Sequence, residues 1–246
     1  MYHLHMTLAT AKRILLQISH DHRTIALMLV APIMLMSLLH WMFSDTQQVF
    51  DTTAPALLGI FPFVIMFLVT SIATLRERTG GTMERLMTMP IGKFDIIAGY
   101  GIAFTFFGIL QSVITSTFAI YALDMSVPAP QWFVVLIAAA NTILGVALGL
   151  LVSAFARTEF QAVQFMPVFI LPQILICGLF VPLDALPSAL ETLAHIMPLT
   201  YAVDALNLAT TNSEITSDMW GNVWIVSGFI VGAIMLASLT LRRRTG

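Results

Sequence analysis

Six long apolar runs, none of which contains a charged residue, dominate this sequence of 246 residues. They cover residues 25–43, 54–75, 96–123, 132–156, 162–181 and 223–241. A helix of about 20 apolar residues crosses the hydrocarbon core of a bilayer, which is about 30 Å thick. Only 10% of the residues are charged, whereas soluble domains have about 25%. We therefore expect an all-α membrane protein with six transmembrane helices, which form a single transmembrane domain over residues 1–246.

The charged residues between the runs predict which ends of the helices face the cytoplasm. All 11 Lys and Arg residues lie in the N-terminal segment, residues 76–95, residues 157–161 and the C-terminal segment. The remaining segments, 44–53, 124–131 and 182–222, hold none of them and carry eight of the 13 acidic residues. Basic residues are retained on the cytoplasmic side of a membrane. The sequence therefore predicts cytoplasmic termini, in a multi-pass protein of the plasma or inner membrane of a bacterial-type cell.

The first 24 residues carry an apolar stripe at helical spacing, formed by Leu4, Leu8, Ala11, Leu15 and Ile18. The polar residues Lys12, Arg13, Gln17 and His20 lie off this stripe. The pattern predicts an amphipathic helix that lies in the membrane interface, with its basic face toward the lipid headgroups. A solvated leader with a chance periodicity is the alternative.

The segment between the fifth and sixth runs contains two short apolar helical patterns. Pro187 and Pro198 lie at their starts, where the missing N–H of proline costs nothing. Each pattern is about 10 to 12 residues long, which is too short to cross a bilayer. We therefore expect re-entrant helices within residues 182–209.

The loop after the second run, "RERTGGTMERLMTMP" (76–90), combines many charges with signals for a short helix. Gly80 and Gly81 interrupt the preceding helix, Thr82 is a good N-cap, and Pro90 ends the new helix near Met89. A helix this short is unstable alone in water, so we expect it to dock on another protein. A solvated cytoplasmic loop would explain the arginines but not the glycines, the cap and the proline together.

Three stretches of the chain resemble type-2 ABC exporter membrane subunits. The run Ala73–Tyr100, "ATLRERTGGTMERLMTMPIGKFDIIAGY", is similar to the family hallmark after the second span, although Gly80 replaces the usual polar residue. The segment Gly178–Leu206 resembles the second family signature between spans five and six. The segment Arg13–Leu39 looks like the N-terminal part of the drug-export branch. The three matches lie in the family's order along the chain.

The resemblance implies that two copies of the six-span subunit, identical or similar, form the pathway. It also implies two cytoplasmic ATP-binding subunits that bind ATP and Mg, so this chain needs no cofactor, metal or nucleic acid of its own. The helix Thr82–Met89 would be the coupling helix seated on the ATPase, and the N-terminal helix the connecting helix beside it. The coupling residues that the resemblance implies are Arg76, Glu77, Arg78, Gly81, Thr82, Glu84, Arg85, Leu86 and Pro90, with Arg157 and Glu159 in a lesser contact.

The resemblance further implies that spans two and five face each other across the two-fold axis and line the route. Both spans carry large, adaptable apolar side chains of the kind that promiscuous sites use. The residues that we expect on the substrate path are Phe63, Met66, Phe67, Phe169 and Gln173. Ordinary lipid-facing bulk is the alternative interpretation of the same residues.

Motifs of enzymes and of ion-coupled carriers are absent from the sequence. There is no G-x-x-x-x-G-K to hold ATP phosphates, and no G-x-S-x-G, H-E-x-x-H or C-x-x-C, so we expect no catalytic residue. No apolar run carries the ionisable group that ion-coupled carriers usually need at the midplane. We therefore expect a transport subunit of an ATP-driven exporter of amphipathic drugs or other lipophilic compounds. A lipid-linked sugar or polysaccharide exporter of the same family and an ion-coupled carrier or channel are the alternatives.

Overall fold

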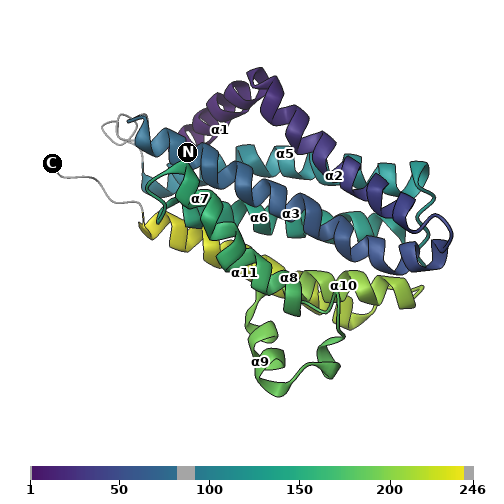
Figure 1. The fold of residues 1–246 in the computed structure, drawn as a ribbon. Coiled ribbons are helices and arrows are strands. Elements are labelled where there is room, and N and C mark those ends of the chain that lie inside the picture. Colours follow the sequence, from purple (N-terminus) through teal and green to yellow (C-terminus); the bar gives the residue numbers. More distant parts are fainter. Residues whose placement is uncertain (1, 82–91, 241–246) are drawn as a thin grey trace.

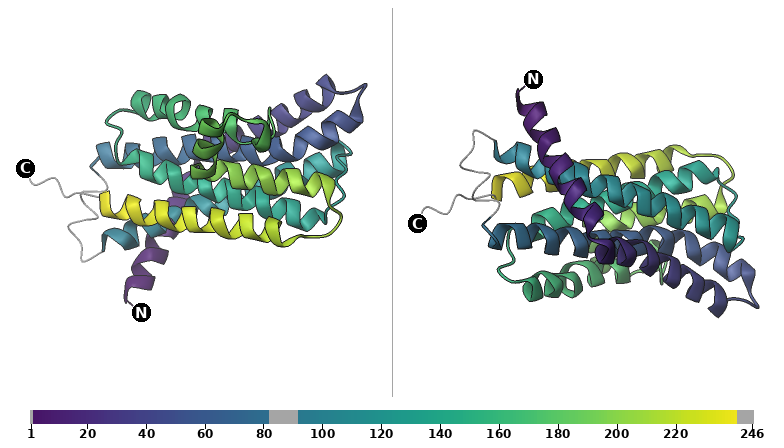
Figure 2. Two further views of the ribbon diagram at one scale, coloured as in Figure 1. Left: turned by 90° about the horizontal axis from the view of Figure 1, so that it is seen from below. Right: turned by 90° about the horizontal axis from the view of Figure 1, so that it is seen from above.

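The computed structural model describes the backbone of residues 2–81 and 92–240, and every regular element in these ranges is a helix. Most helices run along one another in an elongated bundle (Figures 1 and 2). Six described segments are long and apolar enough to cross a membrane: α2 (His22–Met42), α3 (Gln47–Thr79), α5 (Lys93–Ala122), α6 (Gln131–Ser153), Glu159–Ile176 and α11 (Ser217–Thr240). They correspond in order to the six predicted spans, so the prediction of an all-α protein with six spans is confirmed for this part of the chain.

The helix α3 extends beyond the predicted span 54–75 at both ends. It has 33 residues, which is about 50 Å at 1.5 Å per residue. At its first end Phe50 is fully buried, and the Asp51 carboxylate accepts a hydrogen bond of 3.0 Å from the backbone N–H of Ser126. Because a membrane core is about 30 Å thick, a helix of this length reaches beyond it and carries its last residues into the polar region.

The closest packing in the bundle joins α3 to α6. Gly145 and Gly149 of α6 lie against the carbonyl groups of Phe63 and Phe67, and a Cβ on Gly149 would lie 2.7 Å from the Phe67 oxygen. One turn earlier, the Asn141 side chain donates a hydrogen bond of 3.0 Å to the Gly59 carbonyl of α3. Small residues four apart allow two backbones to approach in this way. The two helices therefore form a backbone-to-backbone contact that larger side chains would separate.

Gly149→Ala is expected to lower the free energy of unfolding by about 1–3 kcal/mol, because the added methyl group meets backbone atoms that cannot rotate away. Gly228→Ala on α11 is the matched control, since nothing lies within 4 Å of its added Cβ. Unfolding in a neutral detergent, followed by tryptophan fluorescence, measures both variants. Equal stability of the two variants would contradict the close α3–α6 contact.

The fifth span is not one regular helix. It consists of α7 (Glu159–Phe165), a π-helical turn η1 (Met166–Ile170) and α8 (Leu171–Ile176). Pro167 and Pro172 lie in the first turns of η1 and α8, and each removes one backbone donor from the helical ladder. Helical structure ends at Ile176, before the predicted end of the span at residue 181. The prolines therefore give this span a wide, irregular middle, a feature that often marks functional sites.

The segment between α8 and α11 forms a 3₁₀ turn η2 (Leu183–Ala185) and the helices α9 (Ser188–Ile196) and α10 (Pro198–Thr211). Their starts agree with the positions predicted from Pro187 and Pro198. The helix α10 packs against α3, α6 and α11, whereas α9 extends away from the bundle (Figure 1). The two helices thus have different environments, and their re-entry into a membrane stays a prediction.

The helix α1 (Tyr2–His20) crosses the bundle at an angle in Figure 2 and packs against α5. Its buried residues are Thr7, Thr10, Ala11, Ile14 and Ile18. Leu4 and Leu8 of the predicted apolar stripe are 63% and 50% exposed, so this part of the stripe does not pack on the bundle, and its contact with a membrane interface stays a prediction. On α5, a Cβ on Gly99 would come within 2.7 Å of the Thr10 side chain. Because Gly99 has no side chain, it leaves room for Thr10 of α1 to pack against α5.

Candidate functional site

Three consecutive charged residues, Arg76, Glu77 and Arg78, lie at the end of α3. Successive residues of a helix point about 100° apart, so the three side chains point in different directions. Arg76 contacts α7, and Glu77 contacts α1 and α5. This part of α3 is therefore the point at which four helices are joined by polar side chains.

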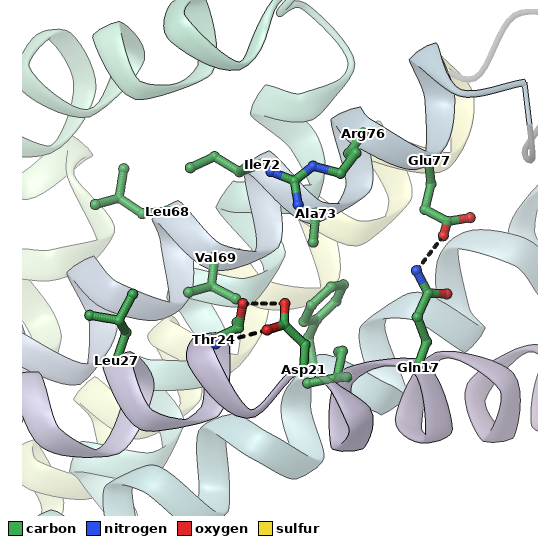
Figure 3. A pocket seen from close by; sticks show the side chains of 12 residues that line it. Gln17, Asp21, Thr24, Leu27, Leu68, Val69, Ile72, Ala73, Arg76 and Glu77 are labelled. Atoms are coloured by element: carbon green, nitrogen blue, oxygen red, sulfur yellow. Dashed lines mark hydrogen bonds between the residues drawn. The ribbon is translucent and has the colours of Figure 1, made fainter.

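Glu77 accepts hydrogen bonds from three side chains on two other helices. Its Oε2 atom accepts from Nη1 and Nη2 of Arg13 at 3.2 and 3.3 Å and from the Tyr100 hydroxyl at 3.0 Å. Its Oε1 atom accepts from Nε2 of Gln17 at 2.7 Å, the bond drawn in Figure 3. The Tyr100 hydroxyl also accepts from Nη2 of Arg13 at 2.8 Å. We call these four residues the Glu77 network.

The Glu77 network is charged and partly buried. The side chain of Glu77 is 11% exposed and that of Arg13 is 34% exposed. Burial acts to lower the pKa of Arg13, but the nearby Tyr100 and Glu77 outweigh it, so the pKa is raised and the guanidinium stays charged. Removal of one partner of such a pair leaves a poorly hydrated charge. The network therefore fixes α1 against α3 and α5.

Arg76 makes a second, more exposed connection. Its Nε and Nη2 atoms donate to Oε1 and Oε2 of Glu159 at 2.9 and 3.0 Å, in a bidentate pair. Glu159 is the first residue of α7, whose start is capped by the Thr158 hydroxyl, an acceptor for the backbone N–H of Gln161 at 3.2 Å. Both charged side chains are more than half exposed, so solvent screens the pair. It orients the start of α7 rather than stabilising the fold.

The side chain of Arg78 is half-buried, and it has no hydrogen bond or ion pair with any residue that the structure describes. The helix ends directly after Arg78, where Gly80 closes the last turn and Gly81 has a positive φ of 74°. Glycine is favoured at that backbone angle. The predicted break at the two glycines is therefore present.

The sequence of the chain also matches a family of known proteins. The family model described as ABC-2 type transporter matches residues 6–209, a range that includes five of the six candidate spans and excludes α11. The chain belongs to the ABC-2 type transporter family. It is a multi-pass membrane protein and a permease of the ABC type.

Relatives of this permease include proteins from a eukaryote and from bacteria. ABC transporter G family member 20 of Dictyostelium discoideum is 23% identical over 203 residues, which are 82% of this chain and 28% of that protein. The linearmycin resistance permease protein LnrN of Bacillus subtilis (strain 168) is 25% identical over 182 residues, 73% of this chain and 46% of that protein. The probable multidrug ABC transporter permease YbhR of Escherichia coli (strain K12) is 25% identical over 173 residues, 69% and 46% of the two chains. The match thus spans less than half the length of each of these relatives.

The structure describes only some of the residues that were predicted to couple the chain to an ATP-binding subunit. Arg76, Glu77, Arg78 and Glu159 lie at one end of the permease, and the two ion pairs join three of them to neighbouring helices. Arg157 is exposed beside them, and its backbone N–H donates to the Gln161 side chain at 2.8 Å. The remaining predicted residues, Thr82, Glu84, Arg85, Leu86 and Pro90, and with them the coupling helix, lie outside the described residues.

The predicted substrate-path residues fall into two environments. The side chains of Phe63, Met66 and Phe67 are fully buried within the subunit, between α3 and its neighbours, whereas Phe169 is 51% exposed. Gln173 is buried, donates to the Phe169 carbonyl at 2.8 Å and accepts from the backbone N–H of Leu199 at 3.4 Å. No described cavity collects all five residues, and their role on a path stays a prediction.

Sequence reasoning missed three residues of the Glu77 network. It assigned Arg13 and Gln17 to a basic face toward lipid headgroups and gave Tyr100 no role, yet all three point to Glu77. The correction has a physical reason, because an interior carboxylate offers the two α1 side chains a stronger partner than water does. Nothing in the sequence spacing links positions 13, 77 and 100.

Glu77→Gln is expected to lower the free energy of unfolding by about 1–2 kcal/mol, because Arg13 loses its ionised partner in a partly buried site. Proteolysis should also reach α1 sooner. Glu159→Gln is the control, since it removes the same charge from an exposed pair and should cost less than about 1 kcal/mol. Detergent unfolding and timed proteolysis measure both effects. If Glu159→Gln loosens α1 as much as Glu77→Gln, the network does not anchor that helix.

Proposed function

We propose that this chain is the membrane-spanning subunit of an ATP-driven exporter, which moves amphipathic drugs or other lipophilic compounds out of the cytoplasm or the inner leaflet. The observation that carries the proposal is the joining of α1, α5 and α7 to the last turns of α3. The end of α3, which leads into the predicted coupling segment, is thereby connected to three helices at once. Relatives named as a linearmycin resistance permease and a probable multidrug permease support the cargo class.

The proposed mechanism transmits force through this end of α3. A cytoplasmic ABC subunit binds ATP and Mg, and its closure displaces the coupling helix in residues 82–89. The displacement reaches α1 and α5 through Glu77 and the fifth span through the Arg76–Glu159 pair. Arg78, which has no ion pair with a described residue, is the residue that we propose contacts an acidic side chain of the ATP-binding subunit. The chain itself contributes positioning and no chemical step.

A second copy of the chain, or a similar subunit, completes the proposed route in the plasma or inner membrane of a bacterial-type cell. We propose that α3 and the fifth span border this route. Among the predicted path residues Phe169 is half exposed on the π-helical turn η1, and it is the member best placed to meet cargo. Phe63, Met66 and Phe67 would have to leave their contacts with the rest of the subunit to do so.

Leu86→Arg and Arg78→Glu are expected to weaken co-purification with the ATP-binding subunit and to abolish nucleotide-dependent efflux, while membrane insertion persists. Each change opposes the proposed contact, through a buried charge in the first case and a reversed charge in the second. Leu193→Arg on α9, which is 40% exposed in the segment opposite the predicted cytoplasmic side, is the control. Pull-down and nucleotide-dependent drug uptake into inverted vesicles are the measurements. Uphill transport by the chain without nucleotide or partner would overturn the proposal in favour of a carrier.

A further inference from the structure

A cavity of about 440 Å³ lies between the elbow of α1 and α2 and the side of α3 (Figure 3). Pockets that hold small molecules have volumes of about 300–1,000 Å³. The polar side chains at one end of this cavity are Gln17, Asp21, Arg76 and Glu77. Three of these four already belong to the connections described above, but Asp21 does not.

The polarity of the cavity changes along its length. The helices α2 and α3 run in opposite directions, so the start of one lies beside the end of the other. From Asp21 to Leu27 the wall covers about 9 Å of α2, and from Glu77 to Leu68 it covers about 14 Å of α3. The other end of the cavity is apolar and is lined by Leu27, Leu68, Val69 and Ile72. The cavity is thus polar at the helix ends and apolar toward the bundle middle, as a lipid leaflet is.

The charges at the polar end are not all compensated. Glu77 is paired with Arg13, and Arg76 is paired with Glu159. The Asp21 carboxylate accepts from the backbone N–H and the hydroxyl of Thr24, at 3.1 and 2.6 Å, and has no ion pair in the described part of the chain. These hydrogen bonds, with a small contribution from the charge of Arg76, hold the pKa of Asp21 below its ordinary value. The polar end therefore carries one excess negative charge at neutral pH.

We propose that this cavity binds an amphiphile with an ammonium head and an apolar chain. The head lies at Asp21, and the chain lies along Leu27, Leu68 and Val69. The exposed Asp21 carboxylate attracts an ammonium head, whereas a neutral or anionic head gains no such attraction. The binding itself does not depend on the proposed function, but the identification of the occupant as cargo rests on it. Because Gln17, Arg76 and Glu77 border the same cavity, an occupant touches the side chains that join α1, α3 and α7.

The test uses the purified chain in a neutral maltoside detergent and two photoreactive probes. Both have a twelve-carbon chain with a diazirine, and they differ only in an ammonium or a sulfate head. Mass spectrometry of the labelled peptides locates the chain. We expect the ammonium probe to label the α2 and α3 segments that contain Leu27 and Leu68, about threefold more than the sulfate probe does. Equal labelling by both probes, or labelling elsewhere, would overturn the proposal.

Two variants separate the head and chain contributions. Asp21→Asn removes the charge but keeps a good N-cap for α2, and it should abolish the preference for ammonium. Leu27→Trp fills the apolar part and should reduce labelling severalfold. Leu38→Trp is its control, because Leu38 lies on the same face of α2, about three turns further along, and is 50% exposed where Leu27 is 68% exposed. Equal labelling of both tryptophan variants would contradict the assignment.

Competition distinguishes two sources of the same chemistry. A cationic drug that the complex exports should displace the ammonium probe at micromolar concentration, as cargo would. Displacement by phosphatidylethanolamine alone would overturn the identification as cargo and assign the cavity to a structural lipid. Labelling needs neither ATP nor the ATP-binding subunit. Labelling without transport would therefore refute the proposed function and leave the binding site intact.

Discussion

The partly buried carboxylate of Glu77 is the interaction on which the arrangement of one end of the bundle depends. It receives donors from α1 and α5, and a charge at this depth is tolerated only with such partners. The constraint adds a polar attachment to the buried face of the N-terminal helix, which holds Thr7 and Thr10 together with Ala11, Ile14 and Ile18. It also joins α1, α3 and α5 at this end, whereas α7 is joined by a weaker, exposed pair.

Contacts with the rest of the bundle hold α3 rigidly on the way to that end. Gly145 and Gly149 of α6 allow the two backbones to touch near the middle of α3, so the helix cannot easily bend or slide there. The fifth span, by contrast, has a π-helical turn that contains Pro167 and is followed by Pro172, and it rests on α10 through the Gln173 side chain. In the mechanism that we propose, a push at the end of the stiff α3 changes mainly the position of this irregular span.

Much of the fold could be read from the chain, because bilayer thickness and proline chemistry act locally. The six spans, the helix starts at Pro187 and Pro198 and the break at Gly80 and Gly81 are all present. The errors arose where a partner far along the chain decides the outcome. Arg13 and Gln17 were assigned to lipid headgroups because their common acceptor, Glu77, lies 64 and 60 positions away.

Hydrophobic run length, the absence of charge within the runs and the order of turn-forming residues thus determined the number and the order of the candidate spans. They did so because each depends on the residue's own contact with lipid, water or backbone. Only the tertiary structure decided which face of α1 is buried, that Phe63 and Phe67 are enclosed, and that the elbow at Asp21 borders a cavity. Those outcomes depend on the shape and charge of surfaces from different helices, which no local pattern specifies.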